Sequence, residues 1–182
     1  MDLRIQRTKR CITEAFFKLR VEKPLEKITV KELSELAMIN KATFYSHYND
    51  IYDLAEQLEN ETIDRILEKT SHPETFVTNP KEATADLAKT LFSQSDVIDT
   101  LFSGSRASAL VSKLEKRIKN KIYEYYPEYQ KDLESDILLT VLIQGGFYAF
   151  TTYANLVDTD RLIEIVGTLS DRILTQNLFT RQ

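Results

Sequence analysis

Residues 28–48, ITVKELSELAMINKATFYSHY, contain two helix-start patterns separated by a short turn. Thr29 and Glu32 have the spacing of a capping box, in which each side chain bonds the free backbone N–H of the other residue. Asn40 repeats the signal, because its side-chain oxygen can accept from an N–H two or three residues later. The stretch therefore predicts two short helices that follow one another closely.

Each of these helices has an apolar face. Leu33, Leu36 and Ala37 share one side of the first helix, and Ala37 is small enough for a close helix crossing. Phe44 and Tyr48, four residues apart, form the inward face of the second helix. The side chains left on its outward and leading faces are Lys41, Ala42, Thr43, Tyr45 and His47.

These outward residues suit a DNA groove. Phosphates accept hydrogen bonds from cations, hydroxyls and imidazoles, and from the N–H groups at helix N-termini. In a helix-turn-helix, the second helix enters the major groove with its N-terminal residues leading. The stretch therefore predicts a helix-turn-helix.

The run NKATFYSHY at residues 40–48, followed by Asp50 and Leu54, resembles the signature of the tetracycline-repressor-like (TetR/AcrR) family of transcriptional regulators. The resemblance is close over residues 1–55 and looser beyond them. It implies an all-α homodimer with an N-terminal three-helix DNA-binding domain. It also implies phosphate contacts from Lys41, Tyr45 and His47 and base contacts from Ala42 and Thr43.

Two positions depart from the family pattern. Met38 stands where Gly is usual in the turn; if that position needs a left-handed backbone, Met costs on the order of 1 kcal/mol. Ile51 stands where a Lys is common at the start of the next helix. One phosphate contact of the family is therefore expected to be missing.

The charge distribution favours a basic N-terminal surface. The net charge is −4, but residues 1–48 hold ten Lys or Arg against six Asp or Glu, a balance of +4, which leaves −8 for the other 134 residues. Arg4 and Arg7 lie at the start of the first helix and Thr29 at the start of the second, and these three complete the predicted DNA contacts. A solvated basic helix end explains the two arginines equally well.

The composition indicates a helical globular protein. Of the 182 residues, 42% are apolar and only four are Gly and four Pro, so the chain can bury a core. The single cysteine, Cys11, adjoins an apolar stripe and is expected to be a small core residue; one cysteine also favours a reducing compartment. No basic segment followed by an apolar stretch begins the sequence, so we expect a cytoplasmic protein.

The all-α chain is expected to form about nine helices in two domains, residues 1–50 and 51–182. The first helix buries a stripe made of Ile5, Ile12, Ala15, Phe16 and Leu19. Asp50 caps a fourth helix that links the domains and ends before Ser71-His72-Pro73, and Asn79-Pro80 opens the fifth. The other expected helices span residues 3–19, 95–101, 106–126, 134–155 and 159–178, besides the two of the helix-turn-helix.

Aromatic side chains are candidates for an effector pocket. They are Phe92, Phe102, Tyr123 and Tyr126. Aromatic residues commonly line pockets for apolar or aromatic ligands, but the same four also fit an ordinary helical core.

The last two helices predict a dimer interface. Residues 137–150 are apolar nearly all round, so their helix should be buried on more than one side. This run is about fourteen residues long and includes Thr140 and Gln144, short of the roughly twenty apolar residues that a membrane span needs. The predicted interface residues are Leu142, Gly145, Gly146, Phe150, Leu162, Ile165, Leu169 and Ile173. Without a partner, these faces would complete the core of a monomer.

Together these features predict a homodimeric repressor that binds a pseudo-palindromic operator in double-stranded DNA and responds to a small-molecule or protein effector. An adaptor that acts through protein contacts is the alternative, favoured by Ile51 and by the net negative charge. A capped helical hairpin that binds no DNA, with His47 solvated and Tyr45 packed on a neighbouring helix, is the lesser alternative for residues 28–48. An enzyme is disfavoured and no cofactor is expected, because the sequence has no Gly-rich phosphate loop, metal cluster or Cys/His dyad.

Overall fold

The computed structural model describes residues 3–70 and 74–178 of the chain, and these residues form eleven α-helices and two 3-10 helices with no strand. The all-α prediction is confirmed, but nine helices were expected. The two additional helices are α5 (Thr75–Thr78) and α9 (Pro127–Lys131). Each has fewer than two turns, which is too short for a 3.6-residue apolar period to show in the sequence. The predicted break at residues 71–73 lies outside the described residues.

The described residues divide into two compact units. Unit 1 comprises residues 3–62 and 95–110, and unit 2 comprises residues 63–94 and 111–178. The boundary expected after residue 50 therefore falls inside unit 1. Two helices, α4 (Ile51–Lys69) and α8 (Ala109–Tyr125), run from one unit into the other.

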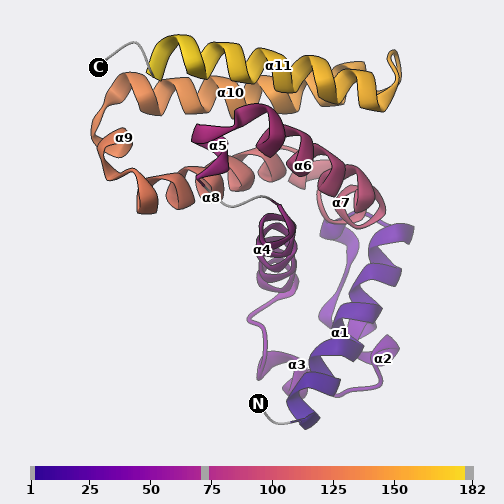
Figure 1. Ribbon diagram of the computed structural model, residues 1–182. Helices are drawn as coiled ribbons and strands as arrows, with labels where there is room; N and C mark the ends of the chain where they lie inside the picture. Colours follow the sequence, from indigo (N-terminus) through magenta and orange to yellow (C-terminus); the bar gives the residue numbers. More distant parts are fainter. Residues whose placement is uncertain (1–2, 71–73, 179–182) are drawn as a thin grey trace. The chain divides into compact units, whose positions relative to one another are not determined.

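Unit 1 contains the N-terminal helices, drawn in indigo and purple in Figure 1. They are α1 (Leu3–Glu22), η1 (Leu25–Lys27), α2 (Val30–Leu36), α3 (Lys41–Tyr45) and the first part of α4. The unit also contains two elements from later in the chain, α7 (Ser95–Leu101) and η2 (Gly104–Arg106). The side chains of Ile12, Phe16, Leu33, Phe44, Leu54 and Leu101 form the core of this unit. The predicted stripe of α1 is thus buried from Ile12 onward.

Two apolar residues of unit 1 are not where the period placed them. Ile5 is 41% exposed and Leu36 is 42% exposed. Ile5 lies in the first turn of α1, and Leu36 ends a helix of seven residues. A helix this short has room for a narrow inward face, which here consists of Leu33, Ser34 and Ala37.

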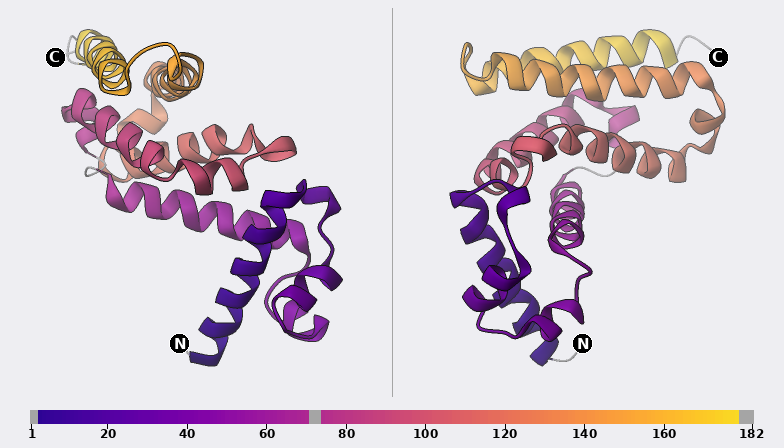
Figure 2. Two further views of the ribbon diagram at one scale, coloured as in Figure 1. Left: turned by 90° about the vertical axis from the view of Figure 1, so that its right-hand side faces the viewer. Right: turned by 180° about the vertical axis from the view of Figure 1, so that it is seen from behind.

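Unit 2 contains α5, α6 (Pro80–Ser93), most of α8, α9, α10 (Leu133–Tyr153) and α11 (Thr159–Leu178). The helices α10 and α11 run antiparallel and side by side, as the orange and yellow ribbons of Figures 1 and 2 show. At Gly167 of α11, an added Cβ would lie 3.1 Å from the carbonyl oxygen of Lys81 in α6. Glycine at this position therefore permits the close approach of α6 to α11.

The helix α10 is less covered than the sequence suggested. Only Ser135 and Leu139 are buried in it. Ile137, Val141 and Tyr148 are between 52% and 70% exposed, although the helix was expected to be buried on more than one side. With 21 residues, α10 is also long and apolar enough, by length and composition, to cross a membrane. The fourteen residues counted from the sequence were the apolar run 137–150, whereas the length and composition that fit a membrane span are those of the whole helix.

The final helix shows the same difference. Leu162 is buried within the chain, whereas Ile165 and Leu169, assigned to the same predicted interface, are 38% and 49% exposed. The helical period shows which side of a helix is apolar. It does not show how much of that side is buried by other helices of the same chain.

Candidate functional site

The starts of α2 and α3 are fixed by the caps that the sequence predicted. The N–H of Glu32 donates to Thr29 Oγ1 at 3.2 Å, and the N–H of Thr43 donates to Asn40 Oδ1 at 2.7 Å. The capping box at Thr29 is only half formed, because the carboxylate of Glu32 accepts from Lys23 Nζ instead of the backbone. Each helix of the pair therefore begins at its predicted residue.

The turn between the helices has a left-handed residue at Met38, whose φ is +54°. The N–H of Ile39 donates to the carbonyl of Ser34, and the N–H of Met38 to the carbonyl of Glu35. These two bonds define a Schellman motif, in which the left-handed position is usually Gly. Met38 thus has the left-handed backbone conformation for which strain was predicted, and its side chain is 93% exposed.

The faces of α3 are divided as predicted. Phe44 and Tyr48 are buried, with their rings 5.6 Å apart. The remaining five side chains face outward to different degrees: Lys41, Ala42 and Tyr45 are exposed, and Thr43 and His47 are half-buried. The short helix presents the ammonium of Lys41, the methyl of Ala42 and the phenol of Tyr45 to solvent, and the imidazole of His47 follows two residues after the helix ends.

The polar groups of this outward face differ in which of their hydrogen-bond donors and acceptors are already used within the chain. The hydroxyl of Thr43 donates to Asn40 Oδ1 at 2.9 Å, so its oxygen remains as an acceptor and its methyl as an apolar contact. Lys41 contacts no carboxylate in the described part of the chain. The ring of Tyr45 packs edge-on against Phe44 with its centroid 5.6 Å away, which holds the phenol in place. An ammonium and a phenol held outward are donors for phosphate.

The basic residues of α1 lie on the same unit. Arg4 and Arg7 are exposed. Arg10 donates to Glu14 at 2.8 Å within the helix. Thr29, the remaining predicted contact, is exposed at the start of α2. All eight predicted DNA contacts thus belong to unit 1.

The start of α4 offers no cation. Asp50 Oδ1 accepts from the N–H of Asp53 at 2.8 Å, which confirms Asp50 as the cap. The carboxylate of Asp53 in turn accepts from the N–H of Asn49 at 2.7 Å, and this bond lowers the pKa of Asp53. Ile51 is 5% exposed, so the position that carries a Lys in the family pattern is here a core position.

Sequence reasoning missed the ion pair that fastens α4 to η2. Arg106 donates twice to Glu59, at 2.7 and 2.6 Å, and Glu59 has no exposed surface. The same segment also accepts a bond of 2.5 Å from Arg20 of α1 at Ser103 Oγ. The sequence signal for this pair is Glu59 itself, which stands four residues after Ala55 and four before Ile63, on the buried face of α4. A carboxylate on a buried helix face needs a cationic partner.

The four candidate pocket aromatics do not form one set. Phe102 belongs to unit 1, where it is buried, and the other three belong to unit 2. Phe92 packs edge-on against Phe150, with centroids 6.0 Å apart, and Tyr126 stacks on Tyr129. The structure therefore places these side chains in separate contacts.

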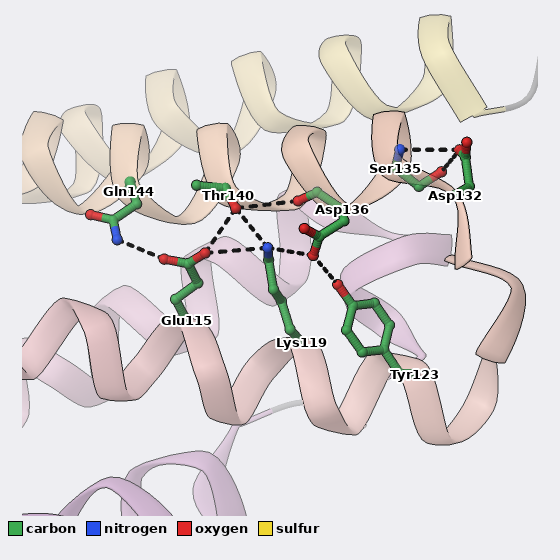
Figure 3. A network of polar contacts seen from close by, with 8 residues as sticks. All are labelled: Glu115, Lys119, Tyr123, Asp132, Ser135, Asp136, Thr140 and Gln144. Atoms are coloured by element: carbon green, nitrogen blue, oxygen red, sulfur yellow. Dashed lines mark hydrogen bonds and ion pairs between the residues drawn. The ribbon is translucent and has the colours of Figure 1, made fainter. Parts of the chain in front are cut away.

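Tyr123 belongs to a polar network between α8 and α10, shown in Figure 3. Lys119 Nζ donates to Asp136 Oδ1 and to Thr140 Oγ1, both at 2.6 Å, and lies 3.3 Å from Glu115 Oε1. Burial alone would raise the pKa of Glu115, but bonds from Gln144, Thr140 and Lys119 lower it. The members satisfy one another, so the network needs no ligand to be complete.

The eight predicted dimer residues are distributed over both sides of the α10–α11 pair. Leu162 is buried in the chain, and Leu142, Gly146, Phe150 and Ile173 are half-buried. Gly145, Ile165 and Leu169 are exposed, and a Cβ added at Gly145 would meet nothing within 4 Å. Across residues 3–70 and 74–178, no three His, Cys, Asp or Glu side chains are grouped so that they could hold a metal ion.

Neither a protein-family model nor a curated protein matches the sequence. The structure matches that of a transcriptional regulator of the TerR/AcrR (tetracycline-repressor-like) family from Aquifex aeolicus VF5, with a TM-score of 0.60 and 19% sequence identity. The match covers 91% of this chain and 99% of the other. The chain therefore has the fold of a TetR/AcrR-type transcriptional regulator.

Proposed function

We propose that the protein is a homodimeric, cytoplasmic transcription regulator that reads a pseudo-palindromic DNA operator with α3. The observation that carries this proposal is the division of α3: Phe44 and Tyr48 fasten it to the core, while Lys41, Ala42 and Tyr45 remain exposed. A helix of five residues with a fixed inner face contributes little core of its own. Its outward side chains are therefore available for recognition.

Each predicted contact has a role that fits its chemistry. Lys41, Tyr45 and His47 donate to phosphates, and Arg4, Arg7 and Thr29 extend the phosphate contacts along the strand. Ala42 and Thr43 meet base edges: a methyl suits the C5-methyl of thymine, and the Thr43 oxygen suits the amino group of adenine or cytosine. This set reads few bases, so much of the affinity comes from phosphates and depends on salt.

The dimer is proposed to form through α10 and α11. Ile137, Val141, Gly145 and Tyr148 recur at intervals of three and four residues, so one face of α10 is exposed and apolar. The exposed Ile165 and Leu169 give α11 a similar face. Two antiparallel pairs related by a two-fold axis would bury both faces in a four-helix interface.

A charge on this face tests the dimer. Val141→Glu should reduce the mass in sedimentation to that of a monomer, because it buries a carboxylate against apolar partners. Val21→Glu, at a 76% exposed position of α1, is the matched control and should leave the mass unchanged. A wild-type monomer, or a Val141→Glu dimer, would contradict the interface. Partition of the wild type into lipid vesicles would assign the apolar face to a membrane.

Regulation is proposed to act through α4, which belongs to both units. A small-molecule or protein effector that prefers one arrangement of unit 2 would shift the separation of the two α3 helices and so the affinity for the operator. In this form the protein is a repressor that its effector releases.

An adaptor that binds a protein instead of DNA is the second candidate. Ile51 is buried at the start of α4, and the exposed Leu36 and Met38 add apolar surface beside α3. These features weaken a phosphate-binding surface and suit a protein partner.

Selection from random-sequence duplexes distinguishes the two functions. The regulator should enrich a pseudo-palindromic sequence whose half-sites lie one helical turn, or a multiple of it, apart. Enrichment of no sequence over several rounds at low salt would overturn the regulator, and the adaptor would then take its place.

A further inference from the structure

The region around the C-terminal end of α3 lacks a cation of its own. Residues 42–64 contain no Lys and no Arg. Of the six acidic residues in this stretch, Glu59 and Asp64 are paired with Arg106 and Arg117, and Asp50 and Asp53 follow α3 most closely in the chain. A DNA phosphate at this end of α3 would meet carboxylates, and repulsion would oppose the docking that Lys41 favours at the other end. A cation from another element would offset this repulsion.

The structure brings Lys9 of α1 to this place. Lys9 stands three residues before Ile12 and seven before Phe16, so it continues the buried stripe of α1 by one turn toward the N-terminus. Its Nζ lies 6.0 Å from the centre of the Tyr48 ring. An ammonium at this distance from a ring face is attracted by the π-electrons. Tyr48 thus holds the cation beside the end of α3.

The other properties of Lys9 fit a phosphate contact. The side chain is half-buried, and among the described residues it forms no ion pair. Arg10, the next residue, donates to Glu14 instead. The ring of Tyr48 lies 6.3 Å from that of His47, a predicted phosphate contact. Lys9 and His47 therefore flank the same ring.

We propose that Lys9 supplies the phosphate contact at the C-terminal end of α3, and that Tyr48 is the residue that positions its ammonium. This inference rests on the proposed DNA-binding function. The contact would make α1 part of the DNA-binding surface, because α1 and α3 would together hold one phosphate in each half-site. The contact is independent of base sequence.

The salt dependence of DNA binding tests Lys9. The probe is the duplex of highest affinity selected from a random library, titrated between low and physiological salt. Lys9→Gln should lower the slope of log K against log salt by about 1, with an equal loss for specific and non-specific duplexes. Lys9→Arg should keep the slope. Lys18→Gln, a matched loss of one charge on the exposed side of α1, should also keep it.

Coupling to Tyr48 tests the positioning role. Tyr48→Phe retains the ring and should retain the slope. Tyr48→Leu should lower the slope in the wild-type background and leave it unchanged in Lys9→Gln, because the ring then has no ammonium to hold. Urea unfolding of each variant separates this effect from a loss of stability.

The outcomes distinguish the inference from the function beneath it. Salt-dependent binding by the wild type with an unaltered slope in Lys9→Gln would overturn the role of Lys9 and leave the regulator standing. A slope that falls equally in Lys9→Gln and Lys18→Gln would reduce the effect to net charge and overturn the contact. A wild type with no DNA affinity would overturn both.

Discussion

The outward face of α3 and the network between α8 and α10 are both rich in polar side chains, but they are built in opposite ways. In the network, Lys119 pairs with both Glu115 and Asp136 and donates to Thr140. Thr140 and Gln144 in turn donate to Glu115. On α3, Lys41 has no carboxylate partner in the described part of the chain, and Tyr45 packs by its ring alone. Groups that satisfy one another hold a fold together, whereas groups held outward are available to a partner.

This comparison predicts where a substitution costs stability and where it costs binding. Residues in the interior polar contacts should affect unfolding first. Residues on the outward face should change DNA binding while the fold keeps its stability.

The largest effect on stability is expected at η2. Arg106→Met removes the bidentate partner of a carboxylate that has no exposed surface, and should lower the free energy of unfolding by about 3 kcal/mol. Urea denaturation followed by circular dichroism measures the loss. Arg106→Lys keeps the charge but cannot bond both carboxylate oxygens in the bidentate geometry of arginine. Its free energy of unfolding should therefore lie between those of Arg106→Met and the wild type. Equal stability of Met and wild type would show that the pair does not fasten α4.

A smaller loss is expected in the α8–α10 network. Lys119→Met leaves the carboxylates of Glu115 and Asp136 without their common cation and should cost about 2 kcal/mol, less than a fully buried pair because Asp136 is partly exposed. Lys116→Met, an exposed change on the same helix, should change the unfolding midpoint little. Equal unfolding midpoints in the two variants would show that the network does not stabilise the fold.

The same network predicts a dependence on pH. Bonds from Lys119 and Tyr123 lower the pKa of Asp136, and those from Gln144, Thr140 and Lys119 lower that of Glu115. A carboxyl whose folded pKa lies below its unfolded value stabilises the fold above the unfolded value, about 4, and loses that contribution as the pH falls through the folded value. The difference in free energy of unfolding between wild type and Lys119→Met should thus shrink as the pH falls from about 6 to about 3, the range in which carboxyl groups titrate. A constant difference would contradict this cause.

A gain is expected at the turn. Met38→Gly relieves a left-handed residue whose side chain is 93% exposed, so the relief exceeds the added chain entropy and should stabilise by about 0.5 to 1 kcal/mol. Met38→Ala keeps a Cβ at the same φ and should change the unfolding midpoint little. A loss of stability in the Gly variant would mean that the Met side chain packs in the folded protein.

The elements that sequence could predict are those fixed by neighbouring residues. Thr29, Asn40, Asp50 and Asn79 each cap the helix that was assigned to them, because a cap acts over three residues. The buried stripe of α1 from Ile12 onward followed from its helical period, which is also a property of nearby residues.

What sequence could not predict depends on partners far along the chain. Glu59 and Arg106 are 47 residues apart, and no local pattern joins them. The exposure of Leu36 was not predicted, because an apolar residue does not record what covers it. Ile165 and Leu169 were predicted to lie in a dimer interface, and the proposed second copy would cover them.

The most direct test is the affinity of Lys41→Ala, Tyr45→Ala for the selected duplex over a salt series, beside the urea stability of the same variant. We predict stability within about 0.5 kcal/mol of the wild type, since both side chains are exposed, together with a salt slope lower by about 1 from the loss of the Lys41 charge. Loss of the neutral Tyr45 phenol should lower the affinity further at every salt concentration without changing the slope. Wild-type affinity and slope in this variant would contradict the claim that α3 reads DNA.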